Sequence, residues 1–217
     1  MSSGGSVGRI LAACTVLAAV HSLFASKPAK DLARRIAGPR YRNGLYRFAF
    51  NIKSVLFLVW AAQWFLRLPD REIYKVEAPW SWLFRAGQVA SLGVLLSAVR
   101  VIDLLDFAGI SQLRSLLAGF DPAPEPEAQG PPLDVNGQMV TDRVFRITRH
   151  PSNLGALGVL TLFPRVTVNR VTLAALVALY VVLGSLHEER RLRAAYGEPF
   201  ERYRREVPFL VPRFSRR

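Results

Sequence analysis

The fold is decided by an apolar stretch near the C-terminus, residues 153–186, which reads NLGALGVLTLFPRVTVNRVTLAALVALYVVLGSL. Pro164-Arg165 and Asn169-Arg170 interrupt this stretch, so it predicts two helical arms joined by a tight turn. The second arm has the length of a membrane span, whereas the first arm is short and either crosses the bilayer with compensation or re-enters it. Both options leave the C-terminus on the same side of the membrane.

Three earlier segments, residues 7–25, 49–66 and 82–99, are also apolar. Each is close to the roughly 20 residues that span a hydrocarbon core of about 30 Å. The chain is therefore predicted to be all-α, a polytopic membrane bundle of about five transmembrane helices. The last two are expected to form a tight hairpin, followed by a cytoplasmic amphipathic helix.

A cleaved signal peptide is the alternative for the first segment, because Arg9 precedes the apolar run and small residues close it. The basic block at residues 27–47, which is expected to be a loop, argues against this alternative, because such a block resists translocation. By the positive-inside rule the block is cytoplasmic, which predicts an N-terminus outside and a cytoplasmic C-terminal tail. The expected location is a bacterial inner membrane.

The same topology explains the net charge of +13 in a chain that is 51% hydrophobic. Attraction to anionic membrane lipid explains the rest, and no soluble basic face or known module indicates nucleic-acid binding. The single cysteine, Cys14, lies in the first apolar segment, so no disulfide framework is expected. The three histidines are too far apart to predict a metal site.

The order of segments predicts three regions. Residues 1–118 form a three-span membrane region, in which residues 104–117 are an amphipathic helix at the interface or a continuation of the third span. Residues 119–141 form a proline-rich cytoplasmic linker, and residues 142–217 form a C-terminal core with the hairpin and the tail.

Two polar pairs border the hairpin. Arg149 and His150 precede Pro151, which is favoured at the first position of a helix, so the start of the first arm is a place for an anionic group. Glu188 and Glu189 close the second arm, where buried carboxylates are costly without partners. A tight hairpin brings the two pairs together. The resulting cluster suits a zwitterionic ligand with hydroxyl groups, and it equally suits a salt-bridge lock.

In the C-terminal region a series of residues runs from Arg149-His150-Pro151 through Glu188-Glu189, Leu192, Tyr196-Gly197, Phe200 and Tyr203 to Val207-Pro208-Phe209-Leu210 and Pro212. This pattern resembles the core of the isoprenylcysteine carboxyl methyltransferase superfamily, which includes membrane phospholipid N-methyltransferases. The N-terminal half contains His21-Ser22-Leu23-Phe24-Ala25-Ser26, Tyr41-Arg42, Leu45-Tyr46 and residues 103–113. These residues are more loosely similar to the bacterial methanethiol S-methyltransferase and NnrU-type branch.

The resemblance implies an enzyme that uses S-adenosylmethionine. Arg149 and His150 would hold the methionyl carboxylate, and Glu188 and Glu189 would face the ribose hydroxyls and the amine. The implied cofactor contacts as a whole are Arg149, His150, Asn153, Gly155, Glu188, Glu189, Arg193 and Tyr203. Asn153 departs from the family, which often has Tyr there, and Thr141-Asp142-Arg143-Val144-Phe145 replaces the usual Gly-Pro-Tyr.

Methyl transfer from a sulfonium is an in-line displacement, for which the protein mainly positions the reactants and excludes water. No Gly-x-Gly-x-x-Gly follows a strand, which removes a soluble dinucleotide-type platform. The expected acceptor is a small thiol or another lipid-soluble molecule. A thiol attacks as thiolate, so His21 is the predicted catalytic base or polarising group; otherwise it is a capped interfacial residue.

Several alternatives stay open. In one alternative, the acceptor is a prenylcysteine carboxyl or a phospholipid amine instead of a thiol. In another, the chain is an NADPH-dependent reductase of related fold. A non-catalytic membrane assembly factor is the alternative from another class, because a fold can be kept while its chemistry is lost. The oligomeric state is not predicted.

Overall fold

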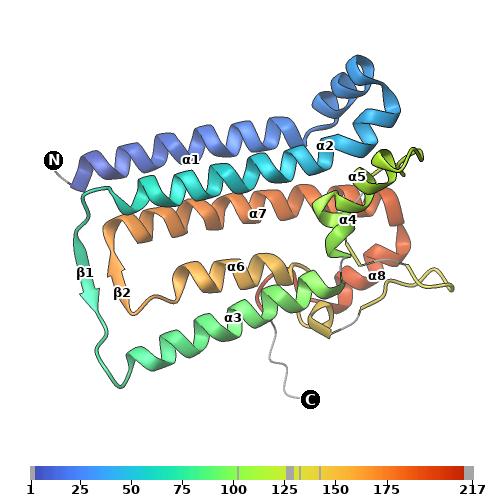
Figure 1. Ribbon diagram of the computed structural model, residues 1–217. Helices are drawn as coiled ribbons and strands as arrows, with labels where there is room; N and C mark the ends of the chain where they lie inside the picture. Colours follow the sequence, from blue (N-terminus) through green and yellow to red (C-terminus); the bar gives the residue numbers. More distant parts are fainter. Residues whose placement is uncertain (1–2, 102, 126–129, 132, 142, 213–217) are drawn as a thin grey trace. The chain divides into compact units, whose positions relative to one another are not determined.

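A computed structural model describes residues 3–101, 103–125, 130–131, 133–141 and 143–212. Its elements, in chain order, are α1 (Ser3–Ala25), α2 (Lys27–Leu66), β1 (Glu72–Lys75), α3 (Ser81–Val101), α4 (Leu104–Ala108), α5 (Ile110–Leu117), the 3-10 helix η1 (Arg143–Arg146), α6 (Pro151–Thr161), β2 (Arg165–Thr167), α7 (Val168–Tyr196) and α8 (Glu198–Glu206) (Figure 1). Parts of the predicted linker, residues 126–129 and 132, lie outside the described residues, as do Asp142 and residues 213–217 of the predicted tail.

The fold is mostly helical, which confirms the all-α prediction in its coarse form. Within the described ranges, 3 helices are long and apolar enough to cross a membrane, namely α1 over Gly4–Ala25, α2 and α7, and this indicates a membrane protein. The helix α3 covers the predicted third span, whereas α6 has 11 residues and rises only about 16 Å. The count of about five spans therefore stays a prediction.

The chain divides into two compact units. Unit 1 comprises Met1–Arg71 and Asp103–Glu125, and unit 2 comprises Glu72–Ile102 and Pro126–Arg217. The helix α3 thus belongs with the C-terminal region rather than with the two helices that precede it in the chain. The predicted division into residues 1–118, 119–141 and 142–217 follows chain order and stays a prediction.

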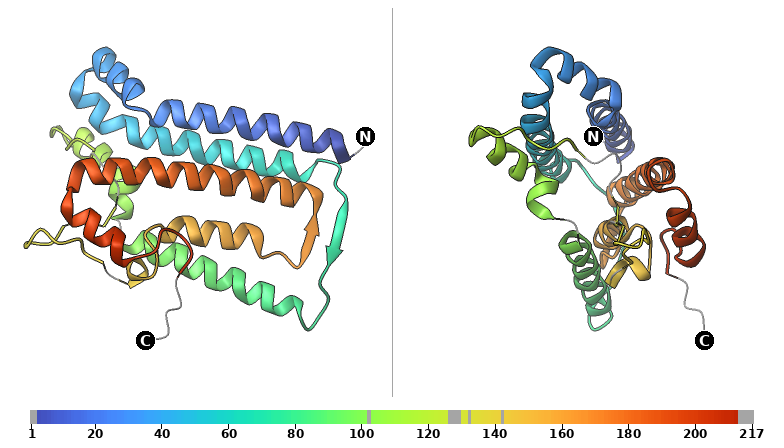
Figure 2. Two further views of the ribbon diagram at one scale, coloured as in Figure 1. Left: turned by 180° about the vertical axis from the view of Figure 1, so that it is seen from behind. Right: turned by 90° about the vertical axis from the view of Figure 1, so that its right-hand side faces the viewer.

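In unit 1, α1 and α2 lie side by side (Figures 1 and 2). Hydrogen bonds join them near both ends: the Ser6 hydroxyl donates to the Pro69 carbonyl just beyond α2 at 2.6 Å, and the Tyr46 hydroxyl donates to the Phe24 carbonyl at 2.6 Å. The first pair of apolar segments is therefore a helical pair held by polar contacts at its two ends.

The basic block, which the sequence suggested was a loop, is helical and forms the first part of α2. The Ser26 hydroxyl accepts a hydrogen bond from the Ala29 amide at 3.4 Å and so caps the helix start. Lysine and arginine are good helix formers, so their charge did not prevent a helix. The helix breaks at Gly38, whose φ of 79° is a conformation that glycine adopts readily, and Pro39 follows the break.

The short helices α4 and α5 pack against α2 in unit 1. Gly109 joins them with a φ of 81°, and a Cβ at this position would lie 2.5 Å from the Phe48 nitrogen, so only glycine fits here. The chain then continues along the basic part of α2, where Glu125 forms ion pairs with Lys30 at 2.6 Å and Arg42 at 3.4 Å. These ion pairs therefore attach the start of the predicted linker to α2.

In unit 2, α6 packs against both α3 and α7 (Figure 2). At one end of these helices β1 and β2 form a two-stranded antiparallel sheet, a departure from the all-α prediction. At the other end α8 folds back, and a small core of apolar side chains forms around the last turns of α7. Its members are Met139, Leu192, Phe200, Tyr203 and Val207. This core supports the polar residues described next.

Candidate functional site

The segment before α6 is held by the C-terminal end of the chain. The Arg149 amide donates to the Pro208 carbonyl at 3.0 Å, and the Thr148 hydroxyl donates to the Phe209 carbonyl at 3.2 Å. His150 is the N-cap residue of α6, and Pro151 begins the helix. The unpaired amides of this first turn therefore lie beside Arg149 and His150.

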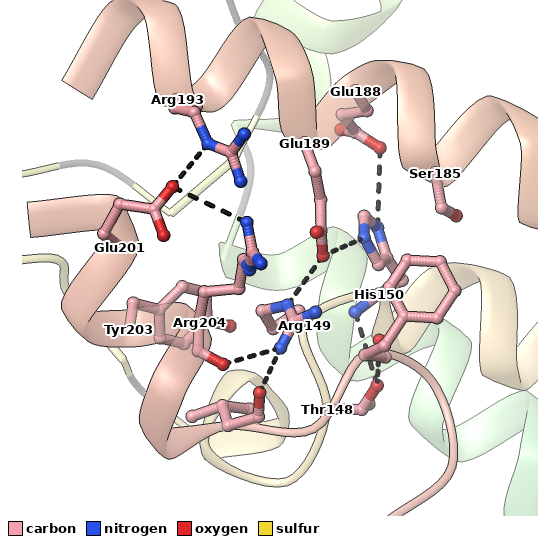
Figure 3. A network of polar contacts seen from close by, with 12 residues as sticks. Thr148, Arg149, His150, Ser185, Glu188, Glu189, Arg193, Glu201, Tyr203 and Arg204 are labelled. Atoms are coloured by element: carbon pink, nitrogen blue, oxygen red, sulfur yellow. Dashed lines mark hydrogen bonds and ion pairs between the residues drawn. The ribbon is translucent and has the colours of Figure 1, made fainter. Parts of the chain in front are cut away.

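Arg149 forms an ion pair with Glu189. Its Nε lies 2.6 Å from Oε1 of Glu189, and the two side chains are only 9% and 11% exposed. Its Nη1 donates to the Arg204 carbonyl at 3.0 Å and also to the Val207 carbonyl. Because three acceptors, one from α7, one from α8 and one from the residue after α8, hold the guanidinium, its orientation is fixed (Figure 3).

His150 lies between two carboxylates. Its Nδ1 is 3.5 Å from Glu188 Oε2 and its Nε2 is 3.3 Å from Glu189 Oε1, so both ring nitrogens face an acceptor. Burial disfavours the charged imidazole, but the two carboxylates outweigh burial and raise the pKa of His150 above its ordinary value. The edge of the ring also packs on Phe209, with centroids 5.1 Å apart.

We call Arg149, His150, Glu188 and Glu189 the polar cluster. The predicted proximity of the two pairs is thus present, and it takes the form of direct contact. Two cations face two carboxylates, with the positive end of α6 beside them. Such an arrangement is close to neutral, and a ligand that carries both a carboxylate and an ammonium group could exchange with these contacts without leaving a net charge.

Three contributors were not predicted, namely Thr148, Ser185 and Phe209. Ser185 is buried and accepts a hydrogen bond from the Asn153 amide nitrogen at 2.8 Å, which links α6 to α7 beside the polar cluster. Ser185 stands three residues before Glu188 and four before Glu189, which places all three on one face of the helix. This spacing could have predicted Ser185 from the sequence. Phe209 gave no such signal, because its contact depends on how the chain returns after α8.

Other residues that were predicted to contact the cofactor make contacts within the protein itself. Arg193 pairs with Glu201, and the buried Tyr203 donates its hydroxyl to the Phe145 carbonyl at 2.9 Å. Burial raises the pKa of Tyr203 well above its ordinary range, so this hydroxyl stays a donor. Gly155 packs on α3: a Cβ there would lie 2.7 Å from the Ser91 carbonyl oxygen. Their contacts with a cofactor stay predictions.

His21 belongs to unit 1, where its ring packs against Phe50 with centroids 4.9 Å apart. The polar cluster belongs to unit 2, so a catalytic role for His21 stays a prediction. Among the residues that the structure describes, no group of three or more histidine, cysteine, aspartate or glutamate side chains could hold a metal ion.

Comparison with known proteins identifies several relatives that match most of this chain. The chain is 25% identical over 207 residues to the methanethiol S-methyltransferase of Pseudomonas deceptionensis, covering 93% of this chain and 71% of the relative. It is 27% identical over 168 residues to methanethiol S-methyltransferase 2 of Bradyrhizobium diazoefficiens, covering 76% of this chain and 59% of that protein. The methanethiol S-methyltransferase of Mycobacterium tuberculosis is 26% identical over 204 residues, with 91% and 74% covered.

The chain therefore spans about three fifths to three quarters of these relatives. No family model and no solved structure matches it. Relatives that share one printed activity across most of the chain confirm the resemblance to the bacterial branch, and they support the prediction that the chain is a methyltransferase.

Proposed function

We propose that this chain, a methyltransferase related to the bacterial methanethiol S-methyltransferases, transfers a methyl group from S-adenosylmethionine to a small thiol or another lipid-soluble acceptor. The enzyme would lie in a bacterial inner membrane with its N-terminus outside and its C-terminus in the cytoplasm. The observation that carries the proposal is the polar cluster, in which buried Arg149 and His150 meet Glu189 at the start of α6.

The cluster offers complementary groups for the amino-acid end of the methyl donor. A carboxylate can take the positions that Glu189 now holds on Arg149 and His150, and the positive end of α6 favours the same charge. Glu189 is then free for the ammonium group. Glu188, of which the side chain is 37% exposed, is available to ribose hydroxyls. Binding is thus an exchange of ion pairs.

When bound, S-adenosylmethionine supplies an electrophilic methyl group on a sulfonium sulfur. The acceptor itself would attack that methyl group, and the donor would leave as its thioether, so no nucleophile from the chain is needed. The residues of the polar cluster bind and orient the donor. They would accelerate methyl transfer by aligning the donor with the acceptor rather than by covalent catalysis. The thiol loses its proton before attack, because the thiolate is the nucleophile.

A non-catalytic role has one observation in its favour. The direct ion pair between Arg149 and Glu189 is also what a salt-bridge lock would contain. The shared activity of the relatives favours an enzyme, since each of them carries the name of a methyltransferase. The two interpretations differ in whether the pair opens to a ligand.

Donor binding tests the proposal. Purified protein in detergent, titrated with labelled S-adenosylmethionine, is expected to bind it saturably, and Glu188→Gln should weaken binding by about tenfold because a charged acceptor is lost. Glu198→Gln is the matched control, because Glu198 is an exposed carboxylate on α8 that pairs with Arg205 at 2.7 Å. Absence of saturable binding to the wild-type protein would remove the proposal.

The acceptor requires a second assay. Methyl incorporation from the labelled donor is measured with small thiols, prenylcysteine analogues and phosphatidylethanolamine in parallel. The proposal expects the thiols to be methylated fastest. Preference for a prenylcysteine carboxyl or a lipid amine would keep the methyltransferase and replace the acceptor class.

A further inference from the structure

One lysine of unit 1, Lys53, has no role in the function proposed above. Lys53 lies in the apolar part of α2, a helix that meets the criteria for a membrane span. Its Nζ is buried, and no hydrogen-bond partner reaches it among the residues that the structure describes. An ammonium group carries three donors, and an unpaired charge in such surroundings is costly and marks a functional site by default.

Three phenyl rings surround this ammonium group. Its Nζ lies 4.4 Å from the ring centroid of Phe50, 4.7 Å from that of Phe24 and 5.9 Å from that of Phe57. Phe50 and Phe57 stand three residues before and four residues after Lys53, so they share its helix face, and Phe24 comes from the end of α1. We call Lys53 with these rings the aromatic cage.

The rings attract the cation without satisfying its donors, because a ring face offers no lone pair. A lysine that only reaches for water would expose its ammonium group, whereas this Nζ is buried. Phe24 and Phe57 are 44% and 41% exposed, so the aromatic cage lies at a surface that lipid-soluble molecules can reach. In the described part of the chain no anion therefore pairs with Lys53, and the cage is accessible.

The chemistry of the cage selects a small monoanion with an apolar body. A phosphate dianion needs several donors and is best served by the guanidinium fork, which the cage lacks. A thiolate carries one charge, and sulfur makes favourable contacts with aromatic rings. The ring centroids of His21 and Phe50 are 4.9 Å apart, so the predicted catalytic histidine borders the cage.

We propose that Lys53 and the rings of Phe24, Phe50 and Phe57 form a site that binds a small alkanethiolate. The inference rests on the proposed function for the class of its ligand, a small thiol. On binding, the S–H bond of the thiol breaks and the proton passes to water, while the sulfur keeps the electron pair beside the ammonium group. Lys53 stays protonated throughout.

Ethanethiol binding in the absence of methyl donor provides the test. The protein in lipid nanodiscs is titrated with ethanethiol at neutral pH, and bound thiolate is followed by its ultraviolet absorbance, which the thiol lacks. The wild-type protein should show saturable thiolate formation. Lys53→Met and Lys53→Gln should each weaken it by about tenfold or more, because both remove the charge. Both variants remove an uncompensated buried charge, so thermal unfolding should show folded protein.

Lys75→Met is the control, because Lys75 is an exposed lysine on β1 that pairs with Glu77 at 2.9 Å. It should titrate as the wild type does. Unchanged thiolate formation in both Lys53 variants would overturn the proposal, as would a wild-type protein that binds no thiolate.

A methyl-transfer assay separates this inference from the proposed function. Saturable thiolate binding that depends on Lys53, without methyl transfer to any acceptor, would sink the proposed function and keep the site. Methyl transfer to a thiol by a protein whose thiolate binding is unchanged in Lys53→Met would keep the function and sink the site.

Discussion

His150 has a carboxylate at each ring nitrogen, and this sets its response to pH. Because its pKa is raised in the folded protein, the protonated form contributes stability that is complete below the ordinary pKa and is lost as the pH rises through the folded value. The thermal midpoint of the wild-type protein should therefore exceed that of His150→Asn most at about pH 6 and progressively less toward pH 9. Thermal unfolding in detergent across this range measures the difference.

The control for this pH series is His187→Asn, which removes an exposed histidine on the same helix as Glu188. It gives the effect of removing an exposed imidazole, against which the pH-dependent loss in His150→Asn is compared. A gap between the wild type and His150→Asn that widens with rising pH would contradict the assignment of the charged imidazole.

Glu189 is expected to matter more for stability than any exposed carboxylate. Replacing it by glutamine leaves the buried guanidinium of Arg149 without its charged partner, and breaking such a pair typically costs about 3–5 kcal/mol. Glu198→Gln breaks an exposed pair and should cost at most about 1 kcal/mol. Chemical denaturation in detergent compares the two variants, and equal midpoints would show that the Arg149–Glu189 pair is not a buried lock.

Among the elements, the pairing of α6 with α3 depends on glycine. A Cβ at Gly155 would lie 2.7 Å from the Ser91 carbonyl oxygen and 2.8 Å from the Leu95 nitrogen, both backbone atoms that cannot turn aside. Gly155→Ala should therefore push α3 away and cost about 1–3 kcal/mol, as overpacking does. Its thermal midpoint in detergent should fall accordingly.

Gly184→Ala serves as the matched substitution, because a Cβ there meets no atom within 4 Å and alanine is the better helix former. It should leave the midpoint unchanged or raise it slightly. If the two alanine variants behaved alike, close packing of α3 on α6 would not be the reason for glycine at residue 155.

The helices and strands show which features of the sequence were sufficient to predict secondary structure. Apolar length located α1 and α7, and α7 ends at Tyr196 because Gly197 adopts a φ of 61°. The prediction of a loop at residues 27–47 was wrong, because a basic composition indicates the side of the membrane and does not exclude a helix. The sheet of β1 and β2 was not predictable, because its two short strands are far apart in the chain.

The candidate site shows the same limits. The proximity of Arg149 to Glu189 followed from hairpin topology, which needs only the order of the apolar arms. The carbonyl groups of Arg204 and Val207 that hold the guanidinium could not be predicted, because backbone acceptors carry no residue signature. Likewise, Gly155 proved to be a packing position against α3, which belongs to a distant part of the sequence.

At the scale of the whole molecule, unit 2 has two chemically different ends. The sheet of β1 and β2 lies where α7 begins, and the polar cluster lies near where α7 ends (Figure 1). The 29 residues of α7 rise about 43 Å, enough to cross a bilayer with its headgroup regions. If the helix spans the membrane, the two ends face opposite compartments, and the positive-inside rule assigns the arginine-rich end to the cytoplasm.

This orientation predicts which residues an impermeant reagent can reach. In a Cys14→Ser background, which removes the sole cysteine, Lys75→Cys on β1 should react with an impermeant maleimide in intact cells. Arg205→Cys on α8 should react only after the membrane is opened, because the polar cluster must face the compartment that supplies the methyl donor. Both side chains are exposed, so a difference in labelling reports sidedness rather than burial. Labelling of Arg205→Cys in intact cells, with Lys75→Cys protected, would invert the orientation and place the polar cluster outside.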